Sequence, residues 1–418
     1  MDFSGISNRT AEVITGIIPR LEAPSGDSSA VNLSVSENAL LQDEMLQLIK
    51  EGINTGLQRK HLSYAPGVGG DPELRRSLAG FFNTYFLPTT KVKPEHIVVT
   101  AGGGSALGAL MRSICDEGDS VLLLCPIWDG LGLYLLIHGN IKWINVTVPW
   151  LENGPQRSLV EELERAYLNH PNPDRIKAVV FANPNNPLGR CYEPSVLREC
   201  LAFCAEKALH CISDEVYAMS SFSSSAPFPR FTSILSLLDD NLPATLASRV
   251  HVIWSASKDF GCNGLRLGCI ISQSNDTLRL GSGLTSYLEV SSLTTVMTIA
   301  LLNSPHLPSL IAKSSERLTA AYNLLTRGFE RLHIKFIPAN YGLCVFFRLV
   351  DNCSSAKEET AAVHELAQLG LVVSQGQNYA LGDGVWGWAR IIFAYPPDVI
   401  QRALDVLEKF RRGRGGCD

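Results

Sequence analysis

Short apolar segments alternate with longer helical patterns over residues 70–270, and this alternation restricts the folds that the chain can adopt. The segments that resemble strands are short and rich in Val, Ile and Leu; they are 97–100, 120–124, 178–182, 210–213, 250–254 and 269–272. Helical patterns such as 105–114 and 195–206 lie between them. Such alternation is typical of a mostly parallel sheet with helices on both faces. We therefore predict an α/β fold for this part of the chain.

The pattern changes after about residue 290. A long helical region, 290–332, precedes several short strand candidates and a final helix at 398–411. This α+β layout predicts a second, smaller domain, and the N-terminal segment is too short to fold alone. We expect an N-terminal segment (1–50) that packs with the small domain, a large domain (51–300) and a small C-terminal domain (301–418).

The composition is that of an ordinary globular protein, and its charge argues against some partners. Of the 418 residues, 45% are hydrophobic and 18% are charged, and the formal net charge is −5. A chain with this balance has no global basic field, so we expect no nucleic-acid or membrane partner. Its longest apolar runs, such as 121–127, have the length of a strand and are too short for a membrane span.

The spacing of the cysteines indicates the redox state of the cellular compartment. The eleven cysteines show no disulfide-type spacing, which favours a reducing environment. Cys200 and Cys204 lie one helical turn apart in an apolar pattern, so we expect buried thiols there. The N-terminus lacks the basic stretch and apolar core of a signal peptide. We expect a cytoplasmic protein.

Four polar stretches follow strand candidates, where ligands bind in parallel sheets. They are TAGGGSAL (100–107), FANPNNPLG (181–189), SDEVY (213–217) and SASKDFGCNGLRLG (255–268). The glycines of the first stretch let backbone N–H groups approach an anion at a helix N-terminus. The first two stretches are also compatible with plain structural turns. An acid at the end of an apolar strand, as in the third, is costly unless it meets a cation.

Together these stretches supply the groups that pyridoxal phosphate needs. That cofactor requires a lysine for a Schiff base, an anion beside its pyridinium nitrogen, donors to its phenolic oxygen and a phosphate site. Lys258 is the candidate for the lysine and Asp214 for the anion.

Residues 31–407 resemble the fold-type I pyridoxal-phosphate enzymes of the class I and II aminotransferase superfamily. Within it, the chain is most similar to the branch of 1-aminocyclopropane-1-carboxylate (ACC) synthase-like enzymes and fungal carbon–sulfur lyases. The resemblance implies a mostly parallel seven-stranded sheet between helices in the large domain, with a smaller α+β domain. It also implies a homodimer with active sites at the interface.

The resemblance assigns a role to each matching residue. Lys258 carries the cofactor, Asp214 pairs with the pyridinium nitrogen, and Asn186 and Tyr217 bond the phenolic oxygen. Trp128 stacks on the ring, although its sequence context also suits a core residue. The residues that match the phosphate site are Gly104, Ser105, Ser255 and Arg266.

Three further residues match positions that reach the substrate or the partner subunit. Arg390 corresponds to the arginine that binds the substrate α-carboxylate; the alternative is a salt-bridge residue at a strand end. Tyr64 corresponds to the tyrosine that reaches the partner's phosphate site; the alternative is a surface aromatic. Glu37, in the stretch NLSVSENA (32–39), lies by the substrate side chain in ACC synthase-like enzymes and would attract a sulfonium or an amine. Its alternative is an exposed cap of a helix that begins near Leu40.

The reaction is the least constrained property. The loop that carries Tyr64 is longer than in plant ACC synthases, and Gly108-Ala109 stands where those enzymes carry Asn-Glu, so S-adenosylmethionine itself is in doubt. We expect a carbon–sulfur lyase that acts on an S-substituted amino acid, a cysteine conjugate or an S-adenosylmethionine-like compound. Schiff-base formation, α-proton abstraction by Lys258 and elimination would follow one another.

Two alternatives to the lyase remain. One is an aminotransferase that passes the amino group to a 2-oxo acid, and the other is a noncatalytic relative. The choice between β- and γ-elimination is open, and the pocket loops 219–228 and 374–380 have no assigned place.

Overall fold

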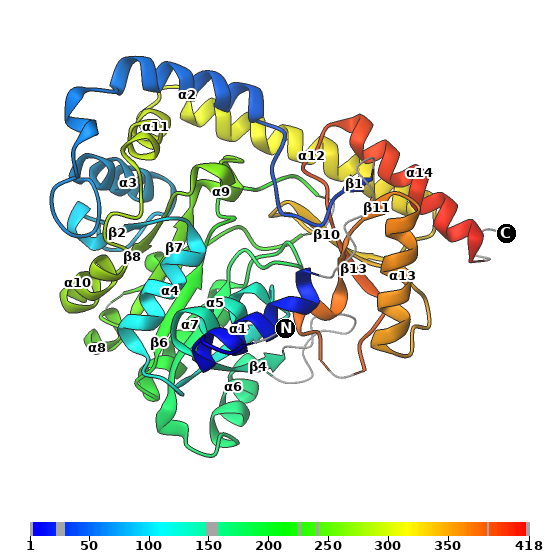
Figure 1. Cartoon of the computed structure of the whole chain (residues 1–418), viewed down its shortest axis with the longest axis horizontal. Helices are drawn as coiled ribbons and strands as arrows, with labels where there is room; N and C mark the ends of the chain where they lie inside the picture. Colours follow the sequence, from blue (N-terminus) through cyan, green and yellow to red (C-terminus); the bar gives the residue numbers. More distant parts are fainter. Residues whose placement is uncertain are drawn as a thin grey trace.

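A seven-stranded sheet with the order β2-β8-β7-β6-β5-β3-β4 forms the centre of the larger part of the structure (Figure 1). The computed structural model describes residues 3–21, 30–147, 158–224, 227–239, 242–382 and 384–414. The strands are β2 (Ile97–Thr100), β3 (Ser120–Cys125), β4 (Lys142–Thr147), β5 (Ile176–Ala182), β6 (His210–Asp214), β7 (Val250–Ser255) and β8 (Gly268–Ile271). Neighbouring strands are parallel except where β8 pairs with β2 and β7. The prediction of a mostly parallel α/β sheet is confirmed.

Both faces of this sheet are buried under helices, as the continuous apolar strands predict. Successive residues of a strand point to opposite faces, so Val252 and Trp254 of β7 join one core cluster and Ile253 joins another. The helices α3 (Pro72–Tyr85) and α7 (Pro194–Glu206) contribute to the first cluster. The helices α4 (Gly103–Ile114) and α5 (Gly130–Gly139) contribute to the second.

Four further helices complete the larger part. They are α6 (Leu159–Leu168), α8 (Ala244–Ala247), α9 (Ala256–Asp259) and α10 (Asp276–Thr285).

The smaller part contains a four-stranded antiparallel sheet with the order β12-β13-β10-β9. Its strands are β9 (Phe336–Ile337), β10 (Cys344–Arg348), β12 (Ser374–Gln375) and β13 (Trp388–Ile392). Three helices pack with this sheet in a separate core; they are α12 (Leu307–Arg331), α13 (Ala356–Gln368) and α14 (Pro397–Gly413).

The N-terminal residues are shared between the two parts. Strand β1 (Val31–Asn32) pairs in parallel with β11 (Leu371–Val372) of the smaller part. In contrast, α1 (Asn8–Leu21) contacts α5 of the larger part, which differs from the expectation that residues 1–50 pack with the smaller one. A Cβ on Gly16 of α1 would make an ordinary contact with the Leu136 side chain of α5, at 3.5 Å.

The long helical region after residue 290 is two helices. Helix α2 (Gln42–Gly56) packs against α11 (Ser292–Leu302), and α12 begins after a break that contains Pro305. None of the described helices combines the length and the apolar character needed to cross a membrane.

Two glycines let β8 lie directly against the turn that follows β2. Gly268 pairs with Thr100, and a Cβ on Gly268 would fall 2.8 Å from the Cα of Gly102. Gly102 has a φ of 98°, in the region that favours glycine. This contact fixes the position of the turn that starts α4.

We predict that Gly268→Ala lowers the free energy of unfolding by about 3 kcal/mol, because the added methyl group meets backbone that cannot move aside. Gly80→Ala, on an exposed face of α3 with no atom within 4 Å of the new Cβ, is the matched control. It should raise stability by about 0.5 kcal/mol through helix propensity. Urea unfolding followed by circular dichroism measures both, and equal effects would contradict the proposed contact.

Candidate active site

A cavity of about 420 Å³ opens at the carboxyl ends of the parallel strands, a size suited to a small-molecule ligand. Loops after β2, β3, β5, β6 and β7 form its walls together with β13 of the smaller sheet. The predicted site residues that line it are Gly104, Trp128, Asn186, Asp214, Tyr217, Ser255, Lys258, Arg266 and Arg390. Residues that are distant in sequence therefore meet at one place.

Lys258 projects from α9, the short helix directly after β7. Ser255 caps this helix by accepting a hydrogen bond from the N–H of Ser257 at 3.1 Å. The Lys258 Nζ donates to the carbonyl oxygen of Ser36 at 2.6 Å. Burial, with Arg390 as the next contributor, lowers the pKa of Lys258 from 10.5 to about 8. The amine is therefore partly free near neutral pH, as a nucleophile or a base requires.

Asp214 ends β6 and presents its carboxyl group to the cavity. Burial raises the pKa of Asp214 to about 6, although the N–H of Val216 donates to its Oδ1 at 3.3 Å. No cation among the described residues forms an ion pair with Asp214. A carboxylate in this position is stabilised by a ligand that brings a positive charge.

Arg390 lies on β13 and is 4% exposed. Its Nη1 donates to Asn186 Oδ1 at 3.1 Å, and its Nη2 donates to the carbonyl oxygen of Ser34. Its buried Nε has no hydrogen-bond partner, and no carboxylate within the described ranges pairs with the guanidinium. These contacts do not fit the alternative of a strand-end salt bridge. They fit a group that receives an anion from outside the chain.

The opposite end of the cavity suits a second anion. Helix α4 begins at Gly103 and has no side-chain cap, so N–H groups of its first turn are available to a ligand. Arg266 lies beside this turn, where its Nη2 donates to the carbonyl oxygen of Ala101 at 3.0 Å. A Cβ on Gly102 would collide with the Arg266 guanidinium, so the glycine is needed for this approach.

These features match pyridoxal phosphate group by group. The amine of Lys258 suits the aldehyde, the uncompensated carboxyl of Asp214 suits the pyridinium nitrogen, and the start of α4 with Arg266 suits the phosphate. Trp128, which lines the cavity and is 39% exposed, suits a position beside the ring and is not a core residue.

Three predicted residues, Ser105, Tyr64 and Glu37, do not line this cavity. Ser105 belongs to the first turn of α4 but is not among the described residues that face the cavity. Tyr64 is 84% exposed and lines a separate hollow with residues 286–292. Tyr64 does not reach the cavity of its own chain, so its expected contact with a partner subunit stays a prediction.

Glu37 lies near the cavity without lining it. Its Oε1 accepts a hydrogen bond from Asn263 Nδ2 at 2.8 Å, and its Oε2 accepts one from the Tyr395 hydroxyl at 3.4 Å. It is not the cap of α2, because that helix begins at Gln42 after Leu41. Its negative charge raises the pKa of Lys258, against the larger effect of burial.

Sequence reasoning missed several residues of the site. Ser36, Asn263 and Tyr134 all line the cavity. Asn263 lies within the stretch that contains Lys258, and Ser36 directly precedes Glu37, so the quoted motifs already contained a signal for both. Tyr134 lies in an apolar helix that offers no such signal.

The two unassigned loops are both fixed close to the site. The N–H of Met219 and the hydroxyl of Ser220 donate to Asp259 Oδ1 at 3.1 and 2.7 Å, which ties this loop to the helix of Lys258. Within the loop 219–228, residues 225 and 226 lie outside the described residues. In the segment 374–380, the carbonyl oxygen of Tyr379 accepts from the N–H of Ile127 at 3.0 Å, beside Trp128.

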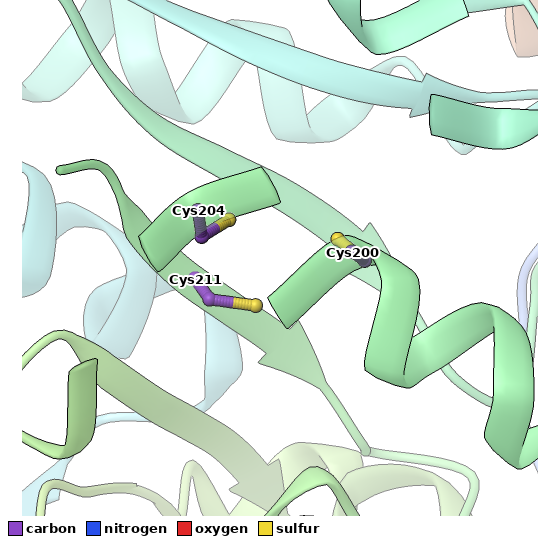
Figure 2. A group of neighbouring side chains, drawn as sticks. All are labelled: Cys200, Cys204 and Cys211. Atoms are coloured by element: carbon purple, nitrogen blue, oxygen red, sulfur yellow. The ribbon is translucent and has the colours of Figure 1, made fainter. Parts of the chain in front are cut away.

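Cys200 and Cys204 are fully buried, as expected, and they meet Cys211 (Figure 2). The three sulfur atoms lie within 4.8 Å of one another between α7 and β6. They belong to the core cluster on one face of the sheet and do not line the cavity.

We predict that Lys258 of the cofactor-free protein reacts with trinitrobenzenesulfonate with a half-maximal rate near pH 8, because the free amine forms as the pH rises through its pKa. In Glu37→Gln the midpoint should move to lower pH, since a charge that raises this pKa is lost. Mass spectrometry of the modified peptides follows Lys258, with the exposed Lys409 as internal control. Identical profiles for Lys258 and Lys409 would contradict the prediction.

Comparison with known proteins establishes the family and agrees with the fold. The family model described as aminotransferase class I and II matches residues 28–407. A probable aminotransferase of Aspergillus oryzae (aclI) is 35% identical over 412 residues, which cover 97% of each chain. A probable aminotransferase of Leptosphaeria maculans (sirI) is 39% identical, with 96% of this chain and 97% of the relative covered. The human probable inactive ACC synthase-like protein 2 is 30% identical over 91% of this chain and 66% of its own length.

Solved structures show the same fold at lower identity. An aspartate aminotransferase variant from Thermus thermophilus aligns with a TM-score of 0.76 at 21% identity, with 97% of this chain and 99% of that chain covered. The aromatic aminotransferase of Pyrococcus horikoshii aligns with a TM-score of 0.75 at 20% identity, with 96% and 99% covered. The match of the family model over most of the chain, with these relatives and this fold, shows that the protein belongs to the class I and II aminotransferase family of pyridoxal-phosphate-dependent enzymes.

Proposed function

We propose that the protein is a carbon–sulfur lyase that acts on an S-substituted amino acid, such as a cysteine conjugate. Bound pyridoxal phosphate supplies the electron sink that acidifies the α-hydrogen of an amino acid. The side chains of this protein then determine which substrate binds and where its protons move. The roles that we propose for these side chains are those that the sequence resemblance implies.

The observation that carries this proposal is the set of charges around the cavity. The cations among the described lining residues are Lys258, Arg266 and Arg390. Lys258 is the anchor, Arg266 lies at the phosphate end and Arg390 suits the α-carboxylate. No cation of this set is left to bind a second carboxylate. Dicarboxylic amino acids and dicarboxylic 2-oxo acids, which many amino-group exchanges use, therefore find no counter-ion for their distal carboxylate in this set.

Glu37 adds a negative charge that also disfavours a second carboxylate on the substrate. Its carboxylate is held by Asn263 and Tyr395, and its charge acts on Lys258. A carboxylate whose charge reaches the cavity repels a distal carboxylate of the substrate and favours a neutral or cationic side chain. A thioether and a sulfonium both meet this condition.

Lys258 is placed to move the protons that elimination requires. With a pKa of about 8, its amine accepts the α-proton near neutral pH and becomes an ammonium group. The carbonyl oxygen of Ser36, 2.6 Å from the Nζ, stabilises that ammonium and holds it by the cavity. The ammonium then returns the proton, either to carbon or to the departing sulfur.

Amino-group transfer to a 2-oxo acid is the second candidate. The description of the family model and the names of the fungal relatives favour it. Both reactions begin with the same proton transfer at Lys258, so they differ in the fate of the substrate side chain.

We further propose that the protein acts as a homodimer in the cytoplasm. The side chains of Tyr64, Tyr287 and Leu288 line one hollow and are 84%, 51% and 46% exposed, and Leu62, close to Tyr64 in the sequence, is 85% exposed. Apolar side chains gathered in this way are typical of an interface. A second copy that covers this face would bring Tyr64 to its partner, in agreement with the role that the resemblance implies.

We predict that the holoenzyme converts S-alkyl cysteines to a thiol, pyruvate and ammonium, which is the balance expected for β-elimination followed by addition of water. S-adenosylmethionine and common amino acids are tested beside them, and mass spectrometry identifies the products. Lys258→Ala should abolish thiol release, because both the anchor and the base are lost. Stoichiometric amino exchange with a 2-oxo acid, without release of a thiol or of methylthioadenosine, would contradict the lyase and support the aminotransferase.

We also predict that Glu37→Gln tightens the binding of L-glutamate about fivefold, because removing a like charge is worth about 1 kcal/mol at this range. The affinity for neutral S-methylcysteine should not change. Spectral titration of the holoenzyme measures both dissociation constants. Glu330→Gln, on an exposed part of α12, is the matched control. An unchanged affinity for glutamate would show that Glu37 does not act on the substrate side chain.

A further inference from the structure

Two aromatic rings of α5 fit into a groove that two glycines leave on α4. Tyr134 and His138 lie one turn apart on α5, and their rings are stacked at 6.0 Å. Gly104 and Gly108 lie one turn apart on α4. A Cβ on Gly104 would fall 2.6 Å from the Tyr134 hydroxyl oxygen, and a Cβ on Gly108 would fall 2.5 Å from Cδ2 of the His138 ring. The glycines are therefore required for the rings to approach the helix.

This packing places the Tyr134 hydroxyl at the first turn of α4. Tyr134 lines the same cavity as Gly103, Gly104, Ser255 and Arg266. Its ring also meets Trp128 edge to face, with the centroids 6.4 Å apart. The side chain is thus held between Trp128 and His138, close to the end of the cavity that suits a phosphate.

The Tyr134 hydroxyl group is available to form a hydrogen bond with a ligand. None of the hydrogen bonds within the described residues involves the Tyr134 oxygen. A phenol carries one donor, and a charged acceptor gives the strongest hydrogen bond to it. The neighbouring helix cap is Gly102, which has no side chain to offer.

We propose that Tyr134 donates a hydrogen bond to the phosphate of bound pyridoxal phosphate, and that Gly104 and Gly108 serve to admit it. The hydroxyl adds a side-chain donor to the N–H groups of α4 and to Arg266. The same packing accounts for a glycine at position 108, where a larger residue would displace His138 and, with it, Tyr134. The proposal concerns the cofactor and holds for either reaction.

The test compares two forms of the cofactor on the full-length protein. Holoenzyme is resolved to apoprotein and titrated with pyridoxal phosphate or with pyridoxal, which lacks the phosphate. Tyr134→Phe should weaken the binding of pyridoxal phosphate about tenfold and leave that of pyridoxal unchanged, because only a hydrogen bond to a charged group is lost. The ³¹P resonance of the bound phosphate should also shift. Tyr167→Phe, on α6, is the control for loss of a hydroxyl elsewhere.

Two results would overturn the proposal. One is wild-type affinity of Tyr134→Phe for pyridoxal phosphate. The other is equal weakening for both compounds, which would assign Tyr134 to packing against the ring. Neither result depends on whether thiol release is observed, so this proposal and the proposed function fail separately.

Discussion

The site depends on holding charged groups in a cavity where none of them forms a direct ion pair among the described residues. Asp214 carries a raised pKa and Lys258 a lowered one because burial disfavours the charge of each. Arg390 is almost fully buried and is bonded to an amide and a carbonyl oxygen. Such groups lower the stability of the empty protein, and a ligand with complementary charges removes that penalty on binding. Large apolar cores on both sides of the sheet supply the stability that this arrangement requires.

The backbone of residues 34–38 connects groups for which we propose roles toward the substrate. Ser34 offers its carbonyl oxygen to Arg390 and Ser36 offers its own to Lys258. These partners lie in different parts of the molecule, Arg390 on β13 of the small sheet and Lys258 on α9, which follows β7 of the large sheet. Glu37 adds a bond to Asn263 on the lysine side. A short segment next to β1 thus contacts Lys258, Arg390 and Asn263, the residues around which the proposed roles are arranged.

The sequence was sufficient to predict the sheet and much of the site, for identifiable reasons. Strands β5 to β7 are buried on both faces and appear as apolar runs, and the polar stretches after them define the cavity. Strand β4 was missed because Lys142–Thr147 lies at the sheet edge, where exposed polar residues interrupt the pattern. Arg390 could be placed only through resemblance, since the pairing of β13 with β10 carries no local signal. The contact of Tyr134 with Gly104 depends on how two helices pack, which a linear pattern does not encode.

Helix α12 joins the cores of the two parts of the molecule. Its first turns, with Leu307 and Leu310, are packed in the core of the large sheet, whereas Leu318 to Phe329 belong to the core of the small one (Figure 1). With 25 residues it is about 37 Å long, and its only proline is in its first turn. One helix is therefore part of both cores. The packing of its first turns against the large sheet thus also bears on where the small sheet, with Arg390 on β13, lies.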